Sequence, residues 1–88
     1  MSQVGASLEQ LDQLAAELRR QGGAAASLRS AVTGRLADTL WIGSAADAFR
    51  ERWTQDYDPM LRRLEQDLAE LGGYVGQKRQ QLHEAGNL

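Results

Sequence analysis

The chain has 88 residues, enough for one small domain, and its 42% hydrophobic and 25% charged residues are the balance of a globular protein. Its formal charge of -2 excludes the strongly basic surface with which proteins bind nucleic acids or anionic membranes. The sequence has no cysteine, which excludes disulfides and thiolate metal sites. Its single histidine, His83, cannot form a multi-histidine metal site. We therefore expect neither a metal nor a cofactor.

The N-terminal part of the sequence contains no apolar core of the length found in secretory signals, about 7–15 residues. No apolar run anywhere approaches the roughly 18 residues of a membrane span. If the protein leaves the cell, we therefore expect it to do so without a cleaved signal peptide, from a cytoplasmic pool.

The first predicted element is a helix over about residues 7–38. Ser7 followed by Gln10 matches a capping box, in which the serine hydroxyl accepts a hydrogen bond from a backbone N–H of the first turn. Apolar and small residues then recur at steps of three and four, and Leu14 and Leu28 widen the stripe that they form. The members of this stripe are Leu8, Leu11, Ala15, Leu18, Gly22, Ala25, Val32 and Leu36.

A break follows at residues 39–43. Gly43 can adopt a positive φ that other residues resist, which suits a tight reversal of the chain. Ser44 with Asp47 repeats the capping pattern and predicts the N-cap of a second helix. Trp41, one of two tryptophans, lies inside the break. We expect its indole mainly to pack against the end of the core and only secondarily to contact a partner.

The second predicted helix covers about residues 44–84. Pro59 lacks an N–H and would clash with the carbonyl of Gln55, so we expect a kink there, with Asp58 and Pro59 as N-cap and first position of a restarted helix. The apolar stripe of this helix reads Ala46, Phe49, Trp53, Tyr57, Met60, Leu64, Leu68, Leu71, Val75 and Leu82. No segment alternates with period two, so the chain is predicted to be all-α, an antiparallel helix-turn-helix hairpin.

Two helices of this length pack against each other along only one narrow strip of residues, which we call the seam. Small chains rarely bury enough apolar surface in one such strip to be stable alone. A second hairpin would complete a four-helix bundle, so we expect a dimer or a larger assembly. The residues predicted to form the motif and the partner interface are Trp41, Gly43, Ala46, Phe49, Trp53, Leu11, Leu18, Leu64 and Leu68.

Trp41-x-Gly43 at a predicted bend, followed by Ala46 and Phe49, resembles the WXG (ESAT-like) family of small helical-hairpin proteins of type VII (ESX) secretion. The resemblance extends over the whole chain in length and layout. It implies a non-enzymatic secretion substrate or secretion partner that pairs with itself or with another WXG-type hairpin. It further implies contact with the secretion machinery, which includes an FtsK/SpoIIIE-type ATPase, and it leaves open the N-terminal helical domain of a toxin as partner.

The sequence departs from the family at the C-terminal export motif. Many members of the family, or one partner of each pair, carry Tyr-x-x-x-Asp/Glu there. In this chain Tyr74 is followed four residues later by Lys78, so the tyrosine is present and the charge is inverted. We therefore expect a member of a pair whose partner carries the export motif.

Three other classes of function compete with this one: an enzyme, a membrane-active hairpin and a generic helical adaptor. The acidic residues of the second helix interleave with arginines, as on a solvated helix face, and no phosphate loop, HExxH or GxSxG pattern occurs, so an enzyme is not expected. A membrane-active hairpin would carry a basic polar face, which this slightly acidic chain lacks. A generic helical adaptor would share the fold and differ only in its partner.

Overall fold

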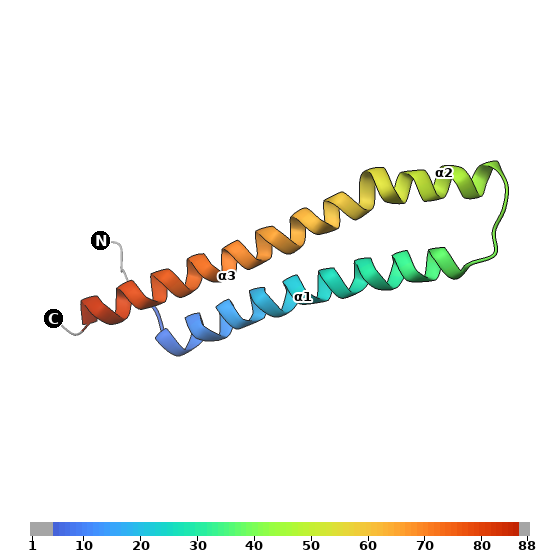
Figure 1. Cartoon of the computed structure of the whole chain (residues 1–88). Coiled ribbons are helices and arrows are strands. Elements are labelled where there is room, and N and C mark those ends of the chain that lie inside the picture. Colours follow the sequence, from blue (N-terminus) through green and yellow to red (C-terminus); the bar gives the residue numbers. More distant parts are fainter. Residues whose placement is uncertain (1–4, 87–88) are drawn as a thin grey trace.

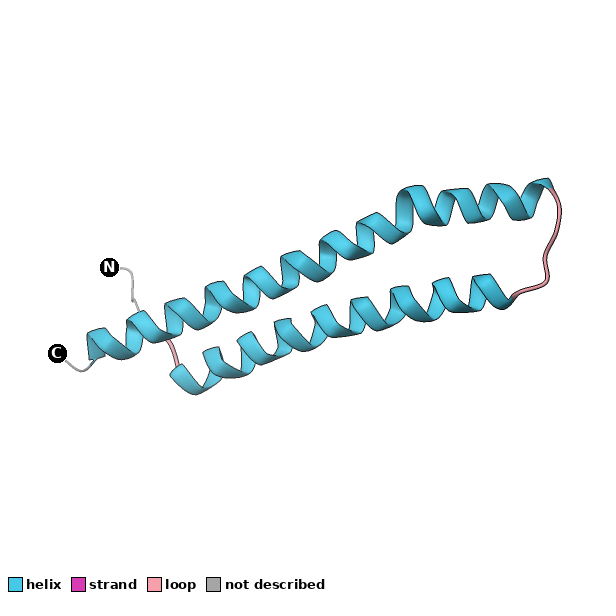
Figure 2. Cartoon of the chain, in the orientation of Figure 1, coloured by secondary structure: helices cyan, strands magenta, loops and turns pink. Residues whose placement is uncertain are grey.

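The computed structural model describes residues 5–86 and shows two long helices side by side (Figure 1). The first is α1 (Leu8–Asp38). The second consists of α2 (Ser44–Arg52), a five-residue π turn (Trp53–Tyr57) and α3 (Asp58–Gly86), which run on from one another as a single bent helix. Residues 5–86 contain no strand (Figure 2), so the predicted all-α class is confirmed.

The two predicted helix caps have different outcomes. The hydroxyl of Ser7 accepts a hydrogen bond from the Gln10 N–H at 3.2 Å, as expected. The prediction that Ser44 caps the second helix is wrong, because Ser44 is already helical and makes no side-chain cap bond. Gly43 takes the cap position with a φ of 126°, and its carbonyl accepts from the Asp47 N–H at 3.0 Å. A positive φ is available to glycine at little cost, so the chain reverses one residue before the serine.

These caps predict unequal effects of two serine-to-alanine variants. Ser7→Ala should lower the free energy of unfolding by about 1 kcal/mol, because an N–H of the first turn of α1 loses its acceptor. Ser44→Ala, the matched control, should change it by only a few tenths of a kcal/mol. Urea unfolding followed by circular dichroism at one fixed protein concentration measures both. Equal losses in the two variants would contradict the assignment of the caps.

The bend in the second helix lies at the π turn, just before Pro59. The Asp58 N–H donates to the carbonyl of Trp53, five residues back, so the backbone ring is wider here than in an α-helix. The wider turn gives space to the proline ring, which would otherwise meet the Gln55 carbonyl. An α-helix does restart at Asp58, where α3 begins, but Asp58 has helical angles of −59° and −49°, so the prediction that it is an N-cap is wrong.

The π turn also changes which residues of α3 face α1. It holds one residue more than an α-turn, which rotates everything after it by about 100° relative to a continuous α-helix. The predicted stripe assumed a continuous helix, and four of its members, Tyr57, Met60, Leu64 and Leu71, are 41–56% exposed. The residues of α3 that are buried or half-buried lie mostly one position later: Asp58, Leu61, Glu65, Leu68, Gly72, Val75, Gly76, Arg79 and Leu82.

Small residues set the distance between α1 and α3. A Cβ on Gly72 would lie 3.3 Å from the carbonyl oxygen of Ala15 and 3.0 Å from Cγ of Arg19. A Cβ on Gly22 would lie 3.5 Å from that of Leu68. The seam buries little apolar surface, because the only hydrophobic residues of the described chain that are buried are alanines (Ala15, Ala25 and Ala46).

Two neighbouring glycines of α3 provide a test of this close approach. Gly73→Ala adds a methyl group to open space and should stabilise the protein by up to about 1 kcal/mol through helix propensity. Gly72→Leu places a side chain against the backbone of α1 and should destabilise it by about 1–3 kcal/mol. Thermal melts of the two variants and the wild type measure the difference. A Gly72→Leu protein as stable as wild type would show that the helices are further apart than described.

The molecule is a rod with extents of 67 × 23 × 16 Å. Its radius of gyration is 19.6 Å, whereas about 12 Å is typical of a compact domain of this length. Its accessible surface is 6894 Å², against about 5,100 Å² for an average folded monomer of 9.7 kDa. The hairpin therefore exposes far more surface than a self-contained domain of this size.

Candidate partner-binding site

One side of the hairpin exposes large apolar side chains from both helices. Leu14 and Leu28 of α1 are 47% and 50% exposed, and Leu64 and Leu71 of α3 are 46% and 49% exposed. Within each helix the two leucines are separated by multiples of seven residues, which places them on one face with a drift of about 20° per seven residues. We call these four leucines together with Phe49, which is 48% exposed, the apolar face.

Grooves between the helices show that the two halves of the apolar face lie on the same side. A shallow groove of about 240 Å³ is lined by Ala24 and Leu28 of α1 and by Leu61, Leu64 and Leu68 of α3. A second groove, of about 410 Å³, lies nearer the loop. Its lining is mostly apolar and brings Val32 and Leu36 of α1 together with Phe49 of α2.

The residues predicted to bind a partner fall into three groups in the structure. Phe49 and Leu64 belong to the apolar face. Ala46 is fully buried, and four others are half-buried between the helices: Leu11, Leu18, Trp53 and Leu68. Trp41 and Gly43 lie in the loop at the end of the rod.

Three members of the apolar face were missing from that prediction: Leu14, Leu28 and Leu71. All three stood in or beside the predicted stripes. The seven-residue spacings, 14 to 28 and 64 to 71, were the signal that could have separated the apolar face from the seam.

The loop between the helices is held by one arginine. Nη1 of Arg50 donates to the Trp41 carbonyl at 2.8 Å, and Nη2 donates to the Thr39 carbonyl at 3.2 Å. The Trp41 ring packs against Phe49 with 5.7 Å between ring centroids and is 40% exposed. Trp41 therefore connects the loop to Phe49, at the loop end of the apolar face.

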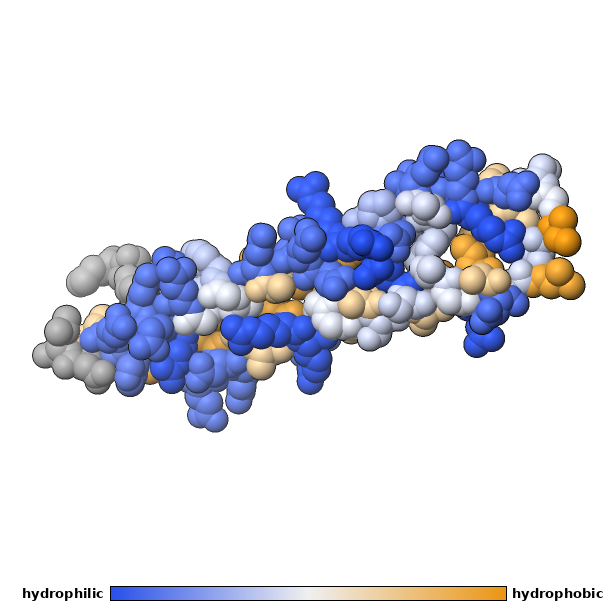
Figure 3. All heavy atoms as spheres, viewed as in Figure 1, coloured by the Kyte–Doolittle hydropathy of each residue, from blue (hydrophilic) through white to orange (hydrophobic). Residues whose placement is uncertain are grey.

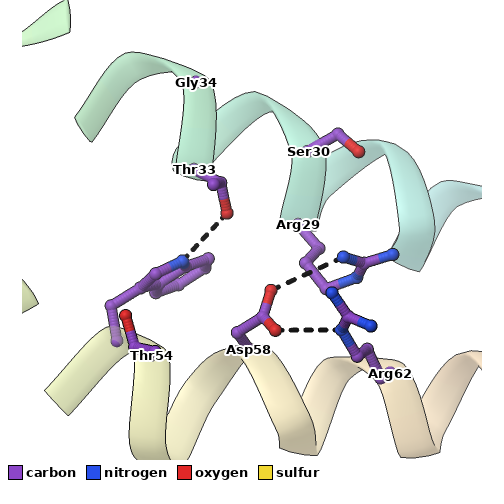
Figure 4. Close-up of a pocket in the computed structure, with 8 residues that line it drawn as sticks. Arg29, Ser30, Thr33, Gly34, Thr54, Asp58 and Arg62 are labelled. Atoms are coloured by element: carbon purple, nitrogen blue, oxygen red, sulfur yellow. Dashed lines mark hydrogen bonds and ion pairs between the residues drawn. The ribbon is translucent and has the colours of Figure 1, made fainter. Parts of the chain in front are cut away.

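The opposite side of the hairpin carries a polar pocket of about 450 Å³ at the bend (Figure 4). Trp53 and Thr33 both line it, and Trp53 Nε1 donates to Thr33 Oγ1 at 3.0 Å. Asp58 lies 3.5 Å from Nη1 of Arg29 and 3.0 Å from Nε of Arg62.

The charged groups of this pocket form ion pairs. Arg29 also reaches Glu65, which lies outside the pocket lining, at 3.6 Å, so its guanidinium contacts two carboxylates of α3. The two contacts of Arg29 join α1 to α3, whereas Arg62 and Asp58 pair within α3. Within residues 5–86, no group of three or more acidic, histidine or cysteine side chains is placed to hold a metal ion.

Tyr74 and Lys78, the two residues at which the resemblance leads one to expect an export motif, lie on the exposed surface of α3. Tyr74 is 58% exposed, and Nζ of Lys78 lies 5.3 Å from the centre of its ring, one helical turn further on. Lys78 also donates to Oε1 of Gln81 at 3.4 Å. The side chains of Tyr74 and Lys78 thus share one helix face.

Comparison of the chain with protein-family models, with curated proteins and with solved structures gives no match. No helix within residues 5–86 is long and apolar enough to cross a membrane.

Proposed function

We propose that this protein acts by binding, as a helical-hairpin partner or substrate of type VII secretion, and catalyses no reaction. The observation that carries the proposal is the apolar face, with large side chains from both helices exposed along one side of a rod whose own core consists of alanines. Exposed apolar patches of this kind mark sites of association. The Trp-x-Gly loop and the hairpin layout support the type VII assignment by resemblance.

The size of the rod fits the proposed binding mode. A stable protein interface buries about 800 Å² on each partner, and one side of a rod 67 Å long and 23 Å wide is large enough to supply this area. Leucines at seven-residue spacing pack best against helices that repeat with the same period. The expected partner is therefore another helical hairpin: a second copy of this chain, a sister WXG-type protein, or the N-terminal helical domain of a toxin.

Export is the second half of the proposal. Lys78 gives this chain an inverted charge in the tail motif, so the partner would supply the acidic group that the secretion machinery reads. The protein would then leave the cell as one member of a complex, through the FtsK/SpoIIIE-type ATPase.

Deletion of that ATPase in the host tests the proposal. The chain should be found in the culture medium of the parent strain and be absent from the medium of the deletion strain. An abundant cytoplasmic protein, followed in the same samples, controls for lysis. Retention inside the cell in both strains would favour a generic helical adaptor, and equal release from both would exclude this export route.

A further inference from the structure

A stripe of six exposed residues runs along α3 and includes the two leucines that this helix contributes to the apolar face. The steps between its members are four, three, four, three and four residues, which is the spacing of the contact positions in a coiled coil. Its apolar and aromatic members are 46–58% exposed. The stripe, which we call the α3 stripe, consists of Met60, Leu64, Asp67, Leu71, Tyr74 and Lys78.

Two members of the α3 stripe are charged, and the contacts of each are made within α3. Asp67 lies 3.9 Å from Nε of Arg63, whose side chain is 84% exposed. Lys78, the only lysine of the sequence, lies over the Tyr74 ring and donates to Gln81. Exposed pairs within one helix contribute little to stability. Charged residues inside an otherwise apolar stripe instead specify the partner and the register of a coiled coil.

A hollow on the α3 stripe has the arrangement that receives a side chain from a facing helix. It measures about 480 Å³ and is lined by Asp67, Glu70, Leu71 and Tyr74. These four residues stand at positions i, i+3, i+4 and i+7, so they surround one point on the helix surface, like the four residues that enclose each inserted side chain in a coiled coil. The occupant that fits this surface is therefore a helix.

We infer that the α3 stripe pairs with the same stripe of a second copy of this chain, running antiparallel, and that Asp67 and Lys78 contact each other across this interface. The two residues lie equally far on either side of the midpoint of residues 72–73. A twofold axis at that midpoint places Asp67 of each copy opposite Lys78 of the other, so the dimer contains two such pairs. The same axis places Leu71 opposite Tyr74 of the second copy, at the hollow.

Other arrangements of two copies lose these contacts. A parallel pair would place Asp67 opposite Asp67 and Lys78 opposite Lys78. Sliding the antiparallel pair by seven residues keeps the coiled-coil spacing but places Asp67 opposite Leu71 or Ala85. Like charges, and charges opposite apolar side chains, disfavour an interface. Charge complementarity thus selects one register and identifies a second copy as an occupant that supplies both opposite charges.

The loop end of the hairpin lies outside this contact. The two copies overlap over residues 59–86, a length of about 42 Å, so α2 and the loop project beyond the overlap at each end. Leu40 and Ile42 of the loop are 89% and 86% exposed, and hydrophobic atoms gather at the loop end of the rod in Figure 3. These side chains remain exposed in the dimer.

The inference rests on the proposed function, because it names one of the three partners that the apolar face could bind. The homodimer is the form of the chain when no sister protein competes for the same face. It gives Lys78 a role in pairing that is separate from export.

Charge reversal in the full-length chain tests the inference by sedimentation velocity. Asp67→Lys creates two like-charge contacts in the dimer and should weaken self-association by roughly tenfold or more, and Lys78→Asp should do the same. In an equal mixture each variant supplies the charge that the other lacks, so association should return to the wild-type level. The double reversal Asp67→Lys/Lys78→Asp should also associate like the wild type.

The matched control is Asp56→Lys. Asp56 also lies 3.9 Å from an arginine of its own helix, Arg52, and both side chains are exposed, but the residue lies outside the overlap of the two copies. This variant should associate like the wild type. All variants should keep the helical circular dichroism signal, and high salt should narrow the gap between the single reversals and the wild type, because it screens exposed charges.

The outcomes separate this inference from the proposed function. Single reversals that associate like the wild type, or that mixing does not restore, would overturn the antiparallel register. A wild-type chain that is monomeric alone but binds a sister hairpin would overturn the second copy as occupant and leave the proposed function standing. A chain that is monomeric alone and also with the sister hairpin would reject both.

Discussion

Replacing Leu28 and Leu64 together by aspartate should abolish association while leaving the hairpin helical. Each leucine is about half exposed on the apolar face, so a carboxylate is tolerated in the separate hairpin. In a complex that covers this face, two unpaired carboxylates would be taken out of water at a cost of several kcal/mol. Sedimentation velocity should show the monomer only, and circular dichroism should retain the helical signal.

The matched control places the same two charges two residues further along each helix. Ser30→Asp/Gln66→Asp turns the carboxylates about 200° away from the apolar face, since each residue advances an α-helix by about 100°. Ser30 indeed lines the polar pocket on the other side of the hairpin. This variant should associate like the wild type. Equal association of both double variants would show that the apolar face is not the interface.

Replacing Lys78 by aspartate should give the chain export that no longer needs its partner. A surface that receives a carboxylate would meet the Lys78 ammonium as a like charge, and opposed charges at an interface discriminate by several kcal/mol. Aspartate supplies the acidic group one helical turn after Tyr74. The chain is expressed in its host with the partner gene deleted, and the culture medium is probed.

The control for this prediction is Lys78→Gln, which removes the ammonium from the Tyr74 ring and adds no carboxylate. It should remain dependent on the partner. Export of the wild-type chain without any partner would show that the signal lies elsewhere, and no gain in Lys78→Asp would show that the missing acid is not what limits export.

The sequence was sufficient to predict the helices and their order. The repeat of apolar residues at steps of three and four, the Ser7 cap and the break that ends at Gly43 are local features, and the structure contains all of them. The face of the second helix that packs against α1 could not be predicted in the same way. A π turn depends on tertiary packing and leaves no clear pattern in the sequence. Its single extra residue was enough to exchange Met60, Leu64 and Leu71 for Leu61, Glu65 and Gly72 in the seam.

The candidate site was predictable to a similar extent. The Trp41-x-Gly43 pattern at the predicted break was enough to identify the loop. Only the structure shows that Arg50 donates to carbonyl groups of this loop and that the Trp41 indole packs against Phe49. Exposure of Leu40 and Ile42 follows from that geometry, which no spacing of residues encodes. The apolar face likewise required the relative rotation of α1 and α3, whereas its seven-residue spacings were visible in the sequence.

The central claim is that the apolar face is covered by a second helical hairpin. Sedimentation equilibrium of the purified wild-type chain at micromolar concentration, alone and mixed with a WXG-type protein encoded beside it, tests this most directly. We expect a dimer or larger assembly in at least one of the two samples, with a cooperative thermal transition whose midpoint temperature rises with protein concentration. A monomer in both samples, melting cooperatively at a temperature independent of concentration, would contradict it.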